Sequence, residues 1–160
     1  MAGLGGYLML KKLGLIALTS LALAAVAQDG PVAAAAGRAA LANKEGRRAN
    51  TTFEVVKFVK EGKEGVRGGL QFHQVPTPQF PNAVTINLPR AAGLGVIENR
   101  AEFGGEAVLV LMTKDGPKRI KGKANVVVVD KGRPGQHDVR DEFVIRFAAA
   151  DGELTYGFGG

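Results

Sequence analysis

The chain has 160 residues, a formal net charge of +6 and no cysteine. These numbers predict one main domain without disulfides, thiol nucleophiles or cysteine metal sites. The only serine, Ser20, lies in the apolar N-terminal stretch, so a serine or cysteine triad for acyl transfer is excluded. Basic and acidic residues are interspersed along the chain, and the positive excess is too small to predict a nucleic-acid partner.

Residues 1–27 have the layout of a secretory signal peptide. Lys11 and Lys12 precede an unbroken apolar run over 13–26, and the small-residue site Ala25-Val26-Ala27 follows. A membrane anchor needs about 20 apolar residues, more than this run offers. We therefore predict a signal helix that is cleaved before Gln28, export to the periplasm or the cell exterior, and no membrane span after cleavage.

Residues 28–50 are rich in alanine and are predicted to be a linker. Cleavage after residue 27 would leave 133 of the 160 residues, and the mature net charge would be +4, because the signal carries two of the 21 basic residues and no acid. The remaining segment, 51–160, is the predicted domain.

That domain consists of short runs rich in Val, Ile, Phe and Thr, separated by glycine and proline clusters. The pattern predicts an all-β fold, either an antiparallel sandwich or a small up-and-down barrel of seven to eight strands. Two stretches, 107–112 and 126–129, are apolar at successive positions, so we expect them to be covered on both faces. The predicted strands are 52–60, 65–73, 83–89, 94–103, 106–113, 118–130, 139–149 and 153–158.

Turns are predicted where glycine clusters separate these runs, at 104–105, 115–117, 133–135 and 151–152. The loop 74–82 contains Pro76, Pro78 and Pro81, which cannot donate ladder hydrogen bonds. We expect it to be an extended crossover between sheets.

A basic cluster lies in the predicted strand 118–130. Strand alternation places Arg119, Lys121 and Lys123 on its solvent face, with Lys118 beside them. Such a cluster is either an ordinary solvated face or a contact for a polyanion.

Carboxylates gather around one loop near the C-terminal strands. Asp130, Asp138 and Asp141 are candidate oxygen ligands for Ca²⁺, although their spacing is not that of an EF-hand. The alternative is a loop held by Asx turns and Asp–Arg pairs. His73 and His137 are the only imidazoles, and no predicted element brings them together, so no catalytic residue or cofactor is predicted.

The segment Ala101–Gly160 resembles a β-rich domain of exported bacterial proteins that is described as post-COAP-like. The resemblance is carried by Ala101–Gly105, by Val127–Asp130 with Pro134-Gly135, by Asp141–Ile145 and by Tyr156 with Gly159-Gly160. It implies a fold rather than an activity. The family pattern continues past the paired glycines into one more strand. If the gene is truncated at this point, the edge that this strand would cover is left open for pairing with another chain.

These observations favour a non-enzymatic structural or interaction module at the cell surface or in the periplasm, acting through a protein partner or self-association. One alternative is a small-ligand carrier with a β-barrel cavity, and a less favoured one is a carboxylate- or metal-dependent hydrolase. A carrier needs an apolar cavity, so a core filled by phenylalanine side chains would count against it. The relevant residues are Phe53, Phe72, Phe103, Phe143 and Phe147.

Overall fold

The computed structural model describes residues 15–20, 29–132 and 141–160, and this part is all-β. It holds no helix with the length and hydropathy of a membrane span. The strands are β1 (Leu15–Ser20), β2 (Gly30–Ala42), β3 (Arg48–Lys60), β4 (Lys63–Val75), β5 (Val84–Leu88), β6 (Gly93–Ile97), β7 (Arg100–Thr113), β8 (Gly116–Val129), β9 (Glu142–Ala149) and β10 (Thr155–Gly159).

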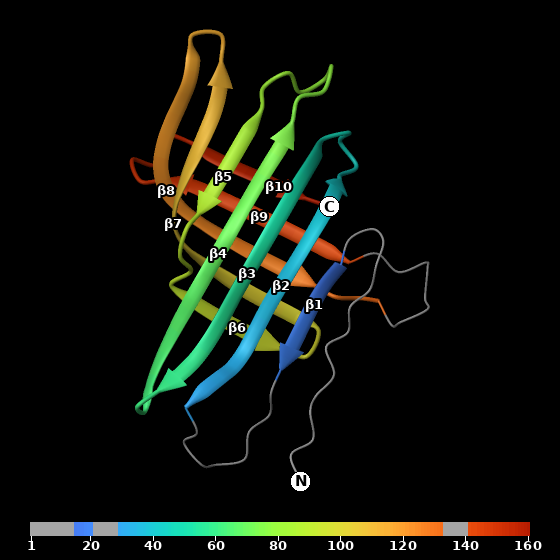
Figure 1. Cartoon of the computed structure of the whole chain (residues 1–160). Helices are drawn as coiled ribbons and strands as arrows, with labels where there is room; N and C mark the ends of the chain where they lie inside the picture. Colours follow the sequence, from blue (N-terminus) through green and yellow to red (C-terminus); the bar gives the residue numbers. More distant parts are fainter. Residues whose placement is uncertain (1–14, 21–28, 133–140) are drawn as a thin grey trace.

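All strands belong to one antiparallel sheet in the order β1-β2-β3-β4-β5-β7-β8-β9-β10, with β6 paired to β7. The sheet curls into a half-barrel, so that β1–β5 lie in front of β6–β10 and the two groups cross (Figure 1). The long strand β7 passes through both groups, because residues 108–111 pair with β5 and residues 100–104 pair with β6. The predicted antiparallel all-β fold is confirmed.

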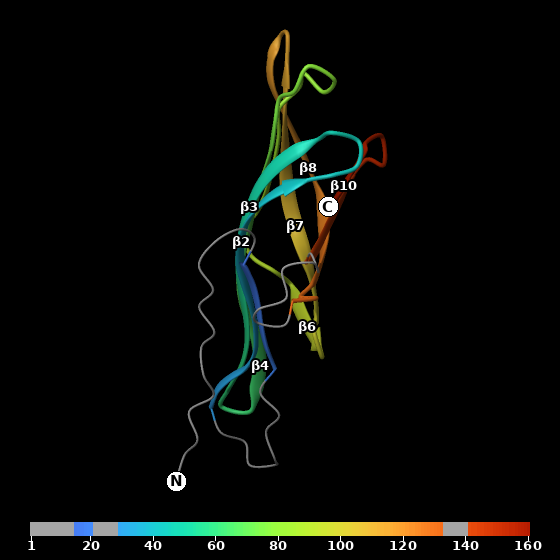
Figure 2. The ribbon, with the colours of Figure 1, turned by 90° about the vertical axis from the view of Figure 1, so that its right-hand side faces the viewer.

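The core lies between the two groups of strands, where phenylalanine rings pack among aliphatic and alanine side chains. Phe72 on β4 is fully buried and stacks on Phe143 of β9, with ring centroids 6.2 Å apart. The ring centroids of Phe53 on β3 and Phe103 on β7 lie 5.5 Å apart. These contacts join the front strands to the rear strands, two groups that Figure 2 shows from the side. An offset aromatic pair adds roughly 1 kcal/mol beyond the burial of its area.

The alanine-rich segment is not a linker, because residues 30–42 form β2. This strand pairs with β3 along its length, from Gly30 opposite Val59 to Ala42 opposite Arg48, and it buries Ala35 and Ala39. Alanine has a low intrinsic strand propensity, so tertiary pairing decides this element. Within the predicted signal, residues 15–20 form β1 against β2. The rest of that signal lies outside the described residues, and cleavage stays a prediction.

The predicted turn at 104–105 is wrong. The chain reverses at Glu98-Asn99 instead, where Glu98 has a φ of 52°, and β7 continues through both glycines. Gly104 and Gly105 allow a close approach: the Gly104 carbonyl accepts a 2.8 Å hydrogen bond from Ala92 N, and a Cβ on Gly105 would lie 2.9 Å from the Arg90 carbonyl oxygen. These two glycines within a strand therefore indicate the close approach of another backbone segment and not a turn.

Two other predicted turns are confirmed, with Gly116 at φ 110° and Gly152 at φ 76°, whereas 133–135 lies outside the described residues. The proline-rich loop is not a crossover, because it joins β4 and β5, which are hydrogen-bonded neighbours. Thr77 and Phe80 close it through reciprocal backbone hydrogen bonds of 2.9 and 3.0 Å.

The stretches 107–112 and 126–129 are covered on one face only. Leu109 and Val128 are buried against the core, but Val108, Val110 and Val127 on the outer face are half-exposed. A single curled sheet has one inner side, and no second layer lies over the outer side in the part of the chain that the structure describes.

Candidate functional site

The structure brings together two of the three predicted metal ligands, Asp130 and Asp141, while Asp138 lies outside the described residues. Their oxygens are already used by the backbone: Asp130 Oδ1 accepts from Gly132 N and Asp141 Oδ1 accepts from Lys131 N, both at 3.1 Å. Among the described residues, no group of three metal-ligating side chains converges. This geometry agrees with the Asx-turn alternative.

The carboxyl group of Asp141 is partly buried in the same loop. Burial raises the pKa of Asp141 above 3.8, the Lys131 N–H opposes this shift, and the nearby charge of Asp130 adds to it. A hydrogen bond between the two carboxyl groups also stabilises the protonated form of Asp141. Lys131 pairs with Glu142 instead of with either aspartate.

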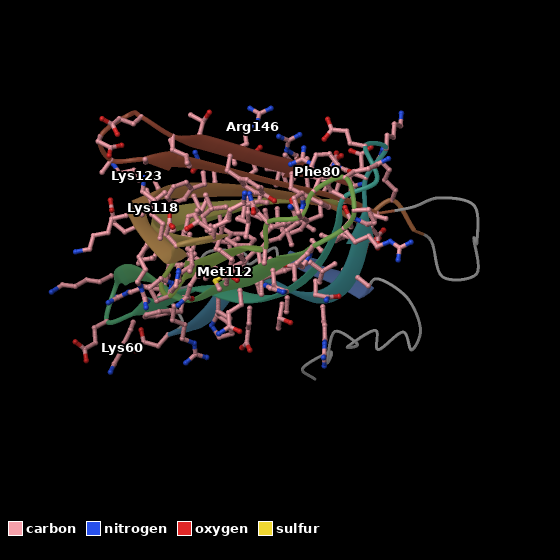
Figure 3. The ribbon with its side chains drawn as sticks, turned by 90° about the horizontal axis from the view of Figure 1, so that it is seen from above. Lys60, Phe80, Met112, Lys118, Lys123 and Arg146 are labelled. Carbon is pink, nitrogen blue, oxygen red and sulfur yellow. The ribbon has the colours of Figure 1, made fainter. Side chains whose placement is uncertain are left out.

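Arg119, Lys121 and Lys123 form a basic stripe along the outer face of β8, as predicted. Their side chains are exposed and lie opposite Val110, Val108 and Glu106 of β7, respectively. Lys123 Nζ lies 3.9 Å from Glu106 Oε1, the one acid in register with the stripe on β7. Lys118 has the opposite parity and extends into solvent near the β7–β8 hairpin (Figure 3).

A polar trough, not predicted from the sequence, crosses the outer face of β2, β3, β4 and β5. It has a volume of about 830 Å³. Hydroxyl, amide, imidazole and guanidinium groups line it, and no carboxylate does. Its outward-facing polar residues are Arg38, Asn50, Thr52, Gln71, His73, Thr85 and Asn87.

The polar groups of this trough are ordered by the strand register. Asn50 on β3 lies opposite His73 on β4, and His73 lies opposite Thr85 on β5. His73 Nδ1 is 3.0 Å from Thr85 Oγ1, a contact that fixes the orientation of the ring. Among the described residues, no hydrogen bond engages the side chains of Asn50, Thr52, Gln71 and Asn87, which leaves their donors and acceptors available to a ligand.

The sequence contains a pattern that indicates the polar trough, but the pattern cannot be recognised from one strand at a time. Each strand carries two polar residues two positions apart: Asn50 and Thr52, Gln71 and His73, Thr85 and Asn87. Each pair alone reads as an ordinary solvated face. Only the alignment of neighbouring strands shows that the pairs are adjacent. His137, the second histidine, lies outside the described residues.

Arg47 holds the two groups of strands together at one end of the molecule. Its Nη1 donates a 2.8 Å hydrogen bond to the Gly157 carbonyl, and its guanidinium carbon lies 5.4 Å from the centre of the Phe80 ring. Nearby, the Tyr156 hydroxyl donates to Gln74 Oε1 at 2.7 Å, and burial raises the pKa of Tyr156 to about 12. We interpret this cluster as a structural latch.

A second hollow, of about 420 Å³, lies beside this latch at the proline-rich loop, lined by Arg48, Pro76 and Gln79 among others. Both hollows open on the outside of the sheet, whereas the space between the strand groups is filled by phenylalanine, aliphatic and alanine side chains. This packing counts against the carrier alternative.

No protein-family model, curated protein or solved structure matches the chain. The post-COAP-like resemblance of Ala101–Gly160 therefore stays a prediction.

Proposed function

We propose that the chain is an exported, non-enzymatic interaction module that binds an anionic polymer of the cell envelope. The basic stripe carries this proposal, because it gathers three exposed cations on one strand face and only one acid lies in register with them on β7. For the architecture, the crossing of two strand groups over a filled core supports a sandwich-like packing rather than a cavity-bearing barrel.

The spacing of the cations in the basic stripe fits a polymer whose negative charges repeat along its chain. Residues two positions apart in a strand point to the same face and are separated by about 7 Å. A row of such cations attracts a polymer through several weak contacts at once, and salt screens each of them. A purely solvated face, the alternative from the sequence, would bind no polymer saturably.

The chain contains a matched control at the β3–β4 hairpin. Lys57, Lys60 and Lys63 are also three closely placed cations, but Glu61 and Glu64 lie among them, and Lys57 Nζ is 2.9 Å from Glu64 Oε2. Their field is therefore partly neutralised. Lys60 marks this hairpin in Figure 3.

The test measures binding of the full chain to immobilised polyglutamate and polygalacturonate. One variant combines Arg119→Gln, Lys121→Gln and Lys123→Gln, and the control combines Lys57→Gln, Lys60→Gln and Lys63→Gln, so both lose the same charge. We expect the stripe variant to bind roughly tenfold or more weakly and with a reduced salt dependence. Equal losses in the two variants would show that net charge, not the stripe, attracts the polymer.

A further inference from the structure

We infer that the polar trough and the basic stripe form one continuous binding face for an extended acidic polysaccharide, whose chain crosses the strands from β2 to β8. This inference rests on the proposed function and adds the chemical class of the polymer. It is carried by the strand register, which aligns the trough and the stripe in the same transverse rows.

Two rows of cross-strand neighbours run over the outer face. In both rows, hydrogen-bonding side chains on the middle strands lead to a cation on β8. One row is Ala40, Asn50, His73, Thr85, Val110 and Arg119; the next is Arg38, Thr52, Gln71, Asn87, Val108 and Lys121.

The dimensions fit a chain of several sugar rings. Neighbouring strands lie about 4.8 Å apart, so the five steps from β2 to β8 span roughly 24 Å along the sheet. The second row has a cation at each end, Arg38 and Lys121, with three neutral polar side chains and Val108 between them. A polymer that carries both hydroxyl and carboxylate groups matches this order of neutral and cationic residues.

The side-chain chemistry selects a sugar acid over other anions. Amides and hydroxyls can both donate and accept, as vicinal hydroxyls require, and a guanidinium fork pairs with a carboxylate in a bidentate manner. Among phenylalanine, tyrosine and tryptophan, only Phe72 lines the trough, and it is fully buried, so it offers no stacking platform for nucleic-acid bases. Binding then depends on hydrogen bonds and charge, with affinity gained from repeated contacts along one chain.

The experiment compares three probes on the full chain: polygalacturonate, polyglutamate, which has the charge without the hydroxyls, and neutral dextran. The trough variant combines Asn50→Ala, Gln71→Ala and Asn87→Ala. Its control, outside the trough, combines Gln79→Ala, Asn125→Ala and Thr155→Ala. All six positions are exposed, so thermal midpoints should stay within about 3 °C of the parent chain.

We expect the parent chain to bind polygalacturonate roughly tenfold or more tightly than polyglutamate, and dextran least. The trough variant should lose this preference while its polyglutamate binding stays unchanged, and the control should behave like the parent chain. If the trough variant keeps full polygalacturonate affinity at an unchanged thermal midpoint, the inference is overturned. In that case, loss of binding to both acidic polymers in the stripe variant would still support the proposed function. If the parent chain binds neither acidic polymer, both are overturned.

Discussion

On β3, β4 and β5 the inner face is mainly apolar and the outer face is mainly polar, because the two kinds of residue alternate along each strand. The inner face carries Phe53, Phe72 and Ile86, all buried, whereas the adjacent outer positions carry exposed or half-exposed polar residues such as Thr52 and Gln71. Because successive strand residues point to opposite faces, the residues that pack in the core are separate from those in which we propose recognition. Substitutions on one face should therefore affect stability, and substitutions on the other should affect binding.

The largest effect is expected on the inner face. Phe72 contacts Phe143, Tyr156 and Phe158, with ring centroids 5.3 to 6.2 Å away. Phe72→Ala removes these contacts and leaves a cavity, so the free energy of unfolding should fall by about 3 to 5 kcal/mol. Urea denaturation followed by circular dichroism measures this change.

The control for that variant is its neighbour on the outer face. Gln71→Ala should change the free energy of unfolding by no more than about 0.5 kcal/mol, because the Gln71 side chain is exposed. A loss at Gln71 comparable to that at Phe72 would show that the two faces are not independent.

A smaller effect is expected at the polar contact that closes the core next to the Arg47 latch. Tyr156→Phe removes the hydrogen bond to Gln74 Oε1, and Gln74 is only 4% exposed. An unsatisfied buried acceptor costs about 1 to 3 kcal/mol. Adding Gln74→Leu to Tyr156→Phe should recover part of the loss in the same denaturation assay, since both polar groups are then absent; an additive further loss would contradict this explanation.

The smallest effect is a pH dependence at the acidic loop. Because the pKa of Asp141 is raised above 3.8 in the folded chain, the folded state binds more protons than the unfolded state from pH 3.8 up to the raised value. The free energy of unfolding therefore falls as the pH rises through that window.

Asp141→Asn stays neutral and keeps an oxygen for the Lys131 N–H, so it tests this sign directly. The thermal midpoint of the parent chain should decline relative to the variant as the pH rises from 3.8 toward neutrality. A parent chain that gains stability relative to the variant over this range would mean that the carboxylate is favoured in the fold.

The sequence predicted those elements whose signal is local. Alternation located β5 and β9, and the solvent face of the basic stripe followed from parity alone. By contrast, β2 has alanine on both faces for much of its length, so it shows no alternation, and its pairing with β3 decides its structure.

The remaining differences come from contacts between distant residues. Gly104 and Gly105 suggested a turn because their packing partners, 90–92, are recognisable only in three dimensions. The polar trough was missed for the same reason: Asn50, Gln71 and Asn87 are far apart in the chain, and the strand register makes them neighbours.

We propose that the outer face binds an acidic polymer through the basic stripe without contributing to the stability of the fold. The most direct measurement is the affinity of the full chain for polygalacturonate at low and high salt, with and without Arg119→Gln, Lys121→Gln and Lys123→Gln. We predict a roughly tenfold or greater loss of affinity at low salt and an unchanged thermal midpoint. Undiminished affinity in this variant, or affinity lost only together with the fold, would contradict the claim.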